Sequence, residues 1–155
     1  IPTGKEGTLS TAFLTSDKSL FIGERNNDDD YGQIGLVSGY MEYQEKLGDI
    51  NIMKNLSREA NEELGMDPSD IHSAEIVGVF THPFRGDVDI TYLARTKLTK
   101  DYCLSGERKK NAKDVEHKKF IEIDSYNQIQ KILSIKNIQY PARGLLENLT
   151  TNDFD

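Results

Sequence analysis

Apolar and polar residues alternate along the first part of the chain in runs typical of strands. Thr8 to Leu14 and Ser19 to Gly23 are rich in β-forming residues, and a turn-forming Ser-Asp pair separates them, so the pattern predicts a hairpin. Residues 26–32, NNDDDYG, are too polar and too acidic to enter a core and are expected to form an exposed loop. The next short apolar run, Ile34 to Val37, predicts a strand that Gly39 ends.

A helical period replaces this alternation after Asp49. Apolar residues recur every four positions, at Ile52, Leu56, Ala60 and Leu64. This is the spacing of one helix face, so the segment predicts an amphipathic helix. Asp49 is the expected N-cap, and Gly65 is the expected C-terminal stop.

The remainder of the chain predicts further strands followed by two helices. The expected strands are Glu75 to Phe80, Val88 to Thr96 and Phe120 to Ile123, the last after a lysine-rich connection. The expected helices are Ser125 to Ile135 and Ala142 to Leu149, the second entered through Pro141. Because no internal repeat or interdomain linker is found, residues 1–155 are expected to form a single α/β domain.

Composition and charge restrict the class of protein. The 155 residues are 36% hydrophobic, and no apolar run approaches the roughly 18 to 20 residues of a membrane span. The net charge of -7 argues against general nucleic-acid binding, although residues 1–94 carry -10 and residues 95–119 carry +5. This asymmetry fits either an ordinary solvated surface or cation binding beside phosphate binding. A single cysteine, Cys103, and no visible secretory signal favour a cytoplasmic location.

Three carboxylates stand close together on the predicted helix. Glu59, Glu62 and Glu63 have i, i+3 and i+4 spacing, which places them on one side of a helix, where they repel one another. Arg58 cannot neutralise all three. A hard divalent cation such as Mg²⁺ or Mn²⁺ can, because it prefers carboxylate and carbonyl oxygens. The plain alternative is that these residues form the solvated face of an amphipathic helix.

The segment REANEELGM, residues 58–66, resembles the second half of the Nudix box, G-x5-E-x7-R-E-U-x-E-E-x-G-U, in which U is a bulky aliphatic residue. Gly39 and Glu45 supply the first half, so every fixed position is filled. One departure is visible: 12 residues separate Glu45 from Arg58 where the pattern has 7, which adds five residues to the loop or the first helical turn. This leaves open whether Glu45 keeps its usual place or Glu42 substitutes for it.

The resemblance implies a fold and an activity. The fold is the Nudix α/β/α sandwich, with a mixed β-sheet between helices. The activity is hydrolysis, dependent on Mg²⁺ or Mn²⁺, of the pyrophosphate linkage of a nucleoside diphosphate joined to another moiety. The partner is then a small nucleotide, with an ADP-ribose-like compound or a dinucleotide favoured. The alternatives are mRNA decapping and a non-catalytic nucleotide-binding module of the same fold.

The resemblance also assigns roles to residues of the box. Glu59 and Glu63 would be the principal metal ligands, Glu62 a further ligand, direct or through water, and the backbone carbonyl of Ser38 would complete the set. Arg58 would orient the helix carboxylates, notably Glu59. The general base would be Glu59 or Glu63, or a glutamate of a distal loop. The candidates in that loop are Glu107 and Glu116, and the structural residues of the box are Gly39, Glu45 and Gly65.

Further residues are candidates for substrate contact. The loop FTHPFRGD is vaguely similar to a segment of ADP-ribose-type Nudix enzymes, and its His82 and Arg85 either contact substrate or have a structural role. Arg25 either meets a phosphate or lies on a plain surface. Aromatic residues that could stack on a base or ribose are Phe80, Phe84 and Tyr92. A basic run would attract RNA or polyphosphate, or would form a solvated loop: Arg108, Lys109, Lys110, Lys113, Lys118 and Lys119.

Overall fold

A seven-stranded mixed sheet forms the middle layer of the computed structural model, which describes residues 7–25, 33–40, 43–44, 49–50, 52–104, 117–134 and 137–154. The strands of this sheet are β1 (Thr8–Leu14), β2 (Leu20–Arg25), β3 (Ile34–Gly35), β4 (Val37–Tyr40), β7 (Ile71–Thr81), β8 (Val88–Thr96) and β9 (His117–Ile123). A separate hairpin consists of β5 (Tyr43–Gln44) and β6 (Asp49–Ile50).

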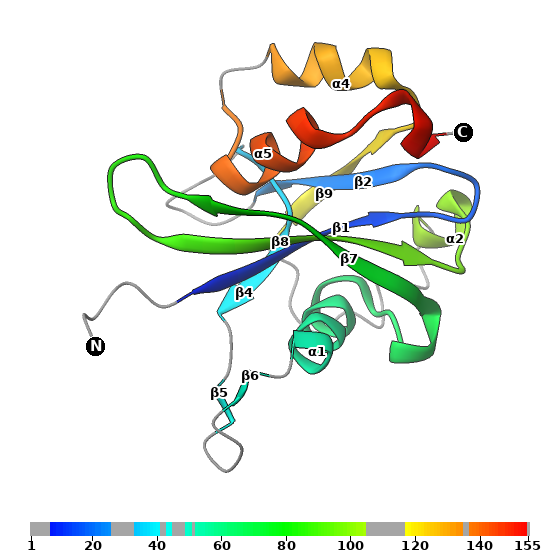
Figure 1. Cartoon of the computed structure of the whole chain (residues 1–155). Helices are drawn as coiled ribbons and strands as arrows, with labels where there is room; N and C mark the ends of the chain where they lie inside the picture. Colours follow the sequence, from blue (N-terminus) through cyan, green and yellow to red (C-terminus); the bar gives the residue numbers. More distant parts are fainter. Residues whose placement is uncertain are drawn as a thin grey trace.

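Helices cover both faces of the sheet. The helices are α1 (Ile52–Leu64), α2 (Lys100–Leu104), α4 (Tyr126–Leu133) and α5 (Tyr140–Asn148), with short 3-10 turns η1 (Pro68–Asp70) and η2 (Thr151–Phe154). In Figure 1, α4 and α5 lie on one side of the sheet and α1 lies on the other. The predicted α/β/α sandwich with a mixed sheet is therefore confirmed. Within the described residues, no helix has both the length and the apolar character that a membrane span requires.

The sheet topology explains why the predicted strand Ile34 to Val37 is broken. The main strand order is β3-β2-β1-β8-β7, and β1 pairs with β8 in parallel while its other pairings are antiparallel. β1 and β2 pair only beside their turn, and β3 then pairs with β2 while β4 pairs with β1. The chain changes partner at Leu36. The prediction that Gly39 ends the strand is wrong, because the ladder with β1 continues through Gly39 to Tyr40.

Two hydrophobic cores fill the spaces between the layers. Alternate residues of β1 enter opposite cores, because successive side chains of a strand point to opposite faces. Leu9 and Phe13 pack on the α1 side, and Ala12 and Leu14 pack on the other. The α1-side core comprises Leu9, Phe13, Val37, Leu56, Ala60, Leu64, Met66, Tyr92 and Ala94. The α5-side core includes Leu93, Ile129, Ala142, Leu145 and Leu146.

The start of α1 differs from the prediction. Asp49 is not the N-cap of α1: it lies in β6, opposite Gln44, and the helix begins at Ile52. Asp49 and Ile50 are instead paired with Gln44 and Tyr43 in the β5–β6 hairpin, which separates β4 from α1 along the chain (Figure 1). The additional residues of the box are therefore accommodated before the helix, and α1 itself remains regular.

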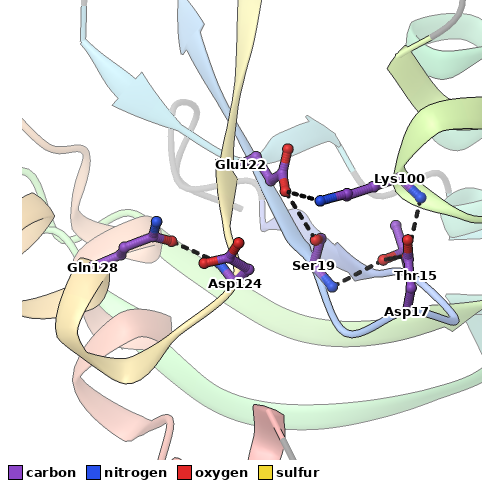
Figure 2. A network of polar contacts seen from close by, with 7 residues as sticks. All are labelled: Thr15, Asp17, Ser19, Lys100, Glu122, Asp124 and Gln128. Carbon is purple, nitrogen blue, oxygen red and sulfur yellow. Dashed lines mark hydrogen bonds and ion pairs between the residues drawn. The ribbon is translucent and has the colours of Figure 1, made fainter.

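A polar network joins three segments at one end of the sheet (Figure 2). The Asp17 carboxylate accepts hydrogen bonds from the Thr15 hydroxyl at 2.6 Å and from the backbone N–H of Lys100 at 3.0 Å. The Lys100 ammonium lies 3.2 Å from Glu122, which also accepts from the Ser19 hydroxyl. The network thus ties α2, which the sequence pattern did not predict, to the β1–β2 turn and to β9.

Candidate active site

Helix α1 packs against β4 and β1 and presents two adjacent stripes of residues to the protein. The apolar stripe Leu56, Ala60 and Leu64 is buried, as its four-residue period predicts. A polar stripe of the same period, Asn55, Glu59 and Glu63, runs beside it. Asn55 is 3% exposed, Glu63 is 4% exposed, and the Glu59 side chain is 15% exposed.

The three box glutamates lie at different angles from the apolar stripe of α1. At about 100° per residue, Glu63 lies nearest the stripe, Glu59 next, and Glu62 farthest away. Glu63 is buried, whereas Glu59 and Glu62 are both half-buried. The helical geometry therefore places Glu59 and Glu63 on the flank of α1 next to the core and directs Glu62 away from it.

Arg58 pairs with the helix carboxylate that the sequence analysis named as its partner. Its Nη2 lies 3.2 Å from Glu59 Oε1, with the two side chains 27% and 15% exposed. An ion pair this exposed contributes little to stability. Its physical effect is to restrict the rotamer of Glu59, because one carboxylate oxygen is held by a charge-assisted hydrogen bond.

The two halves of the box meet where α1 packs on β4. Ser38 is half-buried in β4 and pairs with Ser10, and Gly39 pairs with Leu9. Val37 enters the α1-side core, so the alternation of the strand directs position 39 to the same side. Glu45 and Glu42 lie outside the described residues.

Gly65 ends α1, as predicted, in a left-handed conformation with φ of +67°. Its N–H donates to Asn61 O at 2.9 Å, and the Met66 N–H donates to Ala60 O at 3.2 Å. The Asn61 side chain in turn donates to Met66 O. Met66 is 1% exposed in the α1-side core, so this turn anchors the end of the box helix.

The oxygen donors of this site fit a divalent cation that takes only some of its ligands from the protein. In the part of the chain that the structure describes, no three His, Cys, Asp or Glu side chains lie close enough together to hold a metal ion. The three-glutamate cluster is thus not present as such. Glu59 and Glu63 are successive on one flank of the helix, and Mg²⁺ is commonly bound through one or two carboxylates together with waters and substrate phosphates. These two hard oxygen donors therefore suit Mg²⁺ or Mn²⁺.

His82 organises the turn between β7 and β8. Its Nδ1 accepts backbone hydrogen bonds from Phe84 at 3.2 Å and Arg85 at 3.1 Å. The ring also makes an edge contact with Tyr140 of α5, with ring centroids 5.4 Å apart. Arg85 pairs with Asp87 at 2.9 Å. Both candidates thus contact their own hairpin and its neighbour α5, whereas the box carboxylates lie on α1.

A buried carboxylate beside this turn escaped the sequence analysis. Asp89 is 1% exposed, and it accepts hydroxyl hydrogen bonds from Thr8 and Ser10 at 2.6 Å and from Thr91 at 2.5 Å. Burial raises its pKa, although the three hydroxyls oppose the shift. Burial, followed by the charge of Asp89, also raises the pKa of Tyr140. In the sequence, this cluster is indicated by the alternation of polar residues in β1 and β8. The alternation can be interpreted only when the pairing of Thr8 with Asp89 is known.

Several candidates lie outside the described part of the structure. Arg25 is the last residue of β2, but its side chain is not described. The remaining residues in this class are Glu107, Glu116, Arg108, Lys109, Lys110 and Lys113, together with the side chains of Lys118 and Lys119.

Comparison with known proteins identifies the fold. No family model and no curated protein matches the chain. The NUDIX domain of Shewanella oneidensis NrtR, solved with ADP ribose, is 13% identical with a TM-score of 0.62, over 95% of this chain and 87% of that one. A MutT NUDIX hydrolase from Burkholderia pseudomallei is 17% identical with a TM-score of 0.61, over 94% and 98% of the two chains. A NUDIX-family hydrolase from Clostridium perfringens is 15% identical with a TM-score of 0.59, over 97% of each chain. At these identities the likeness establishes that this chain has the Nudix fold.

Proposed function

We propose that this chain is a metal-dependent Nudix hydrolase that cleaves the pyrophosphate linkage of a nucleoside diphosphate joined to another moiety. The observation that carries the proposal is the placement of Glu59 and Glu63 on the sheltered flank of α1, against the strand that contains Gly39. A solvated helix face would leave both carboxylates exposed. Arg58 compensates part of the charge of Glu59, and a divalent cation bound by both carboxylates would further reduce their mutual repulsion.

Mg²⁺ or Mn²⁺ would be held by Glu59, Glu63 and the backbone carbonyl of Ser38, with Glu62 acting through water from its position farther from the core. When bound, the ion would neutralise the diphosphate and lower the pKa of a coordinated water. The donors are all oxygens, as this chemistry requires.

The protein side chains would orient and deprotonate the attacking water. Arg58 would hold Glu59 in one rotamer through their 3.2 Å contact. Glu59 or Glu63 would accept the proton of the water, and Glu107 and Glu116 remain candidates for the same role. In this proposal Gly39, Glu45 and Gly65 maintain the shape of the box.

An ADP-ribose-like compound is the substrate class that we favour. The hairpin tip supplies Arg85 for a phosphate and Phe84, whose ring is 92% exposed, for stacking on a base. Arg25 would contact a second phosphate. The fold likeness to a NUDIX domain solved with ADP ribose also supports this choice. A cytoplasmic location belongs to the proposal and rests on the cysteine content, because the one cysteine of the sequence, Cys103, cannot form a disulfide within this chain.

The test is hydrolysis of ADP-ribose, NADH and diadenosine polyphosphates by the full chain with Mg²⁺ or Mn²⁺. Products formed in heavy-oxygen water and identified by mass spectrometry would report the bond that breaks and the phosphorus attacked. Glu63→Gln should remove most of the activity while the melting temperature changes little. Glu62→Gln should retain more activity than Glu63→Gln, because Glu62 would act on the metal only through water. Absence of turnover with every compound and both metals, in folded protein, would refute the proposal.

Binding without cleavage is the second candidate, and the β5–β6 hairpin favours it. The hairpin lengthens the connection between Gly39 and α1 by comparison with the family pattern. Calorimetry distinguishes the two functions: saturable binding of ADP-ribose with no product formed, in the presence of either metal, would indicate a nucleotide-binding module.

A further inference from the structure

Strand β7 forms one outer edge of the main sheet. It is the last strand in the order β3-β2-β1-β8-β7, and β8 is its only partner among the described strands. It is 11 residues long, about twice the usual length of a strand. An outer strand presents unpaired N–H and C=O groups, which can continue the sheet into another chain.

The edge formed by β7 lacks the residues that normally prevent such pairing. Lysine and proline are common at protected edges. β7, IHSAEIVGVFT, contains neither, and Glu75 is its only acidic or basic residue apart from His72. The opposite outer strand β9, HKKFIEI, contains two lysines. The two edges therefore differ in composition, and β7 is the one without lysine or proline.

Two large apolar side chains of β7 are exposed on the same face. Ile76 is 58% exposed and Val79 is 60% exposed. Ile76 lies opposite Tyr92, and Val79 lies opposite Ile90. Tyr92 and Ile90 both pack in the α1-side core, so Ile76 and Val79 share this face. A bulge between Ile76 and Gly78 makes this possible, because it shifts the alternation by one residue.

We propose that two copies of this chain form a dimer by antiparallel pairing of their β7 strands. The two-fold axis passes between Val77 and Gly78, so that Ile76 of each copy lies opposite Val79 of the other. This register also places Ala74 opposite Thr81, and Glu75 opposite Phe80. In each of these pairs the two side chains lie on the same face of the joined sheet, because the bulge occurs at the equivalent position of both strands.

Repulsion between like charges disfavours the alternative register that is also compatible with the bulges. Pairing Ala74 with Ile76 would also preserve the two faces, but it would place Glu75 directly opposite Glu75 of the second copy. Like charges in that position are destabilising. In the proposed register the two Glu75 side chains are separated, and each can keep its ion pair with Arg95 at 3.4 Å. A second copy is therefore the occupant that this edge fits.

The experiment measures the mass of the full chain in solution by sedimentation velocity. A dimer is expected at about 100 µM, where even an interface of micromolar affinity is occupied. Ile76→Lys and Val79→Glu should each weaken the dimer about 100-fold, because each change occurs twice in a symmetric interface. Both positions are exposed, so both variants should melt at close to the wild-type temperature.

Mixing the two variants tests the register. A heterodimer should form, because Lys at position 76 of one copy faces Glu at position 79 of the other while the second Ile76–Val79 pair stays intact. Phe84→Lys, on the exposed hairpin tip outside the paired segment, is the matched control and should remain dimeric. A monomeric wild type overturns the proposal, as does a dimer that survives both strand substitutions. Failure of the mixture to associate overturns the register.

Discussion

The contact between α5 and β7 depends on one aromatic ring held between two glycines. Gly144 lies in α5 and Gly78 in β7, and the Phe80 ring lies against both. A Cβ added to Gly144 would lie 2.6 Å from ring atoms Cε1 and Cζ, and one added to Gly78 would lie 2.7 Å from Cζ. The ring therefore cannot move away from one glycine without approaching the other backbone. We predict that Gly144→Ala destabilises the protein.

The magnitude follows from two opposing contributions. Alanine stabilises a helix interior by about 1 kcal/mol relative to glycine. Overpacking of a filled site costs about 1 to 3 kcal/mol, and the confined ring places Gly144→Ala near the upper value. The expected net loss is about 2 kcal/mol, which lowers the melting temperature of a chain of this size by about 4 to 8 °C.

A double-mutant cycle with Phe80→Ala checks the mechanism by urea denaturation. Without the ring, only the helix contribution remains, so Gly144→Ala should then stabilise the protein by about 1 kcal/mol. Gly86→Ala is the control, because Gly86 has φ of +76° and no atom within 4 Å of an added Cβ. Its cost should be the same with and without Phe80. If Gly144→Ala stabilises the wild-type protein, the packing argument is wrong.

Three further predictions concern single side chains. Burial raises the pKa of Asp89, so the charged form of Asp89 opposes folding above that pKa. The free energy of unfolding of the wild type relative to Asp89→Asn, measured by urea denaturation, should therefore increase as the pH falls from neutrality towards 4. The Thr15 hydroxyl, followed by the Lys100 N–H, lowers the pKa of Asp17, so wild-type stability relative to Asp17→Asn should instead decrease as the pH falls through 4 towards the lowered pKa. A slope of the opposite sign for either variant would contradict the assignment of that residue. His82→Ala removes the acceptor of two backbone N–H hydrogen bonds in the hairpin turn. Ordering the turn on binding should then cost about 1 kcal/mol more, which raises KM for ADP-ribose about fivefold with kcat unchanged. A fall in kcat alone would exclude this ordering role.

Elements governed by local periodicity were predictable from the sequence. The strand Val88 to Thr96 has the predicted bounds, and its β-forming run begins directly after the turn residues Gly86 and Asp87. The stripe of α1 and its stop at Gly65 were also correct, because period and capping depend on neighbours within one or two turns. The five-residue helix α2 was missed. It is too short to show a period, and it is held by contacts with Asp17 and Glu122.

Features that depend on pairing between distant segments were not predictable in this way. Nothing local indicates that the chain changes partner at Leu36 or that Asp49 enters a hairpin. The Asp89 cluster has the same origin, since its hydroxyl donors Thr8 and Ser10 are about eighty residues away along the chain. Each becomes visible only once the parallel pairing of β1 with β8 is known.

The distinction among the box glutamates was contained in the sequence but required two patterns to be combined. The spacing of Glu59, Glu62 and Glu63 alone places all three on one side of a helix and makes them equivalent. The apolar stripe through Ala60 gives the direction of the core, and measured from that direction Glu63 lies nearest and Glu62 farthest. Glu63, the nearest of the three, is the one that is buried, and the other two are half-buried. The direction of an acidic helix face is therefore best judged relative to the apolar stripe beside it, because the angle between them determines which carboxylate lies against the core.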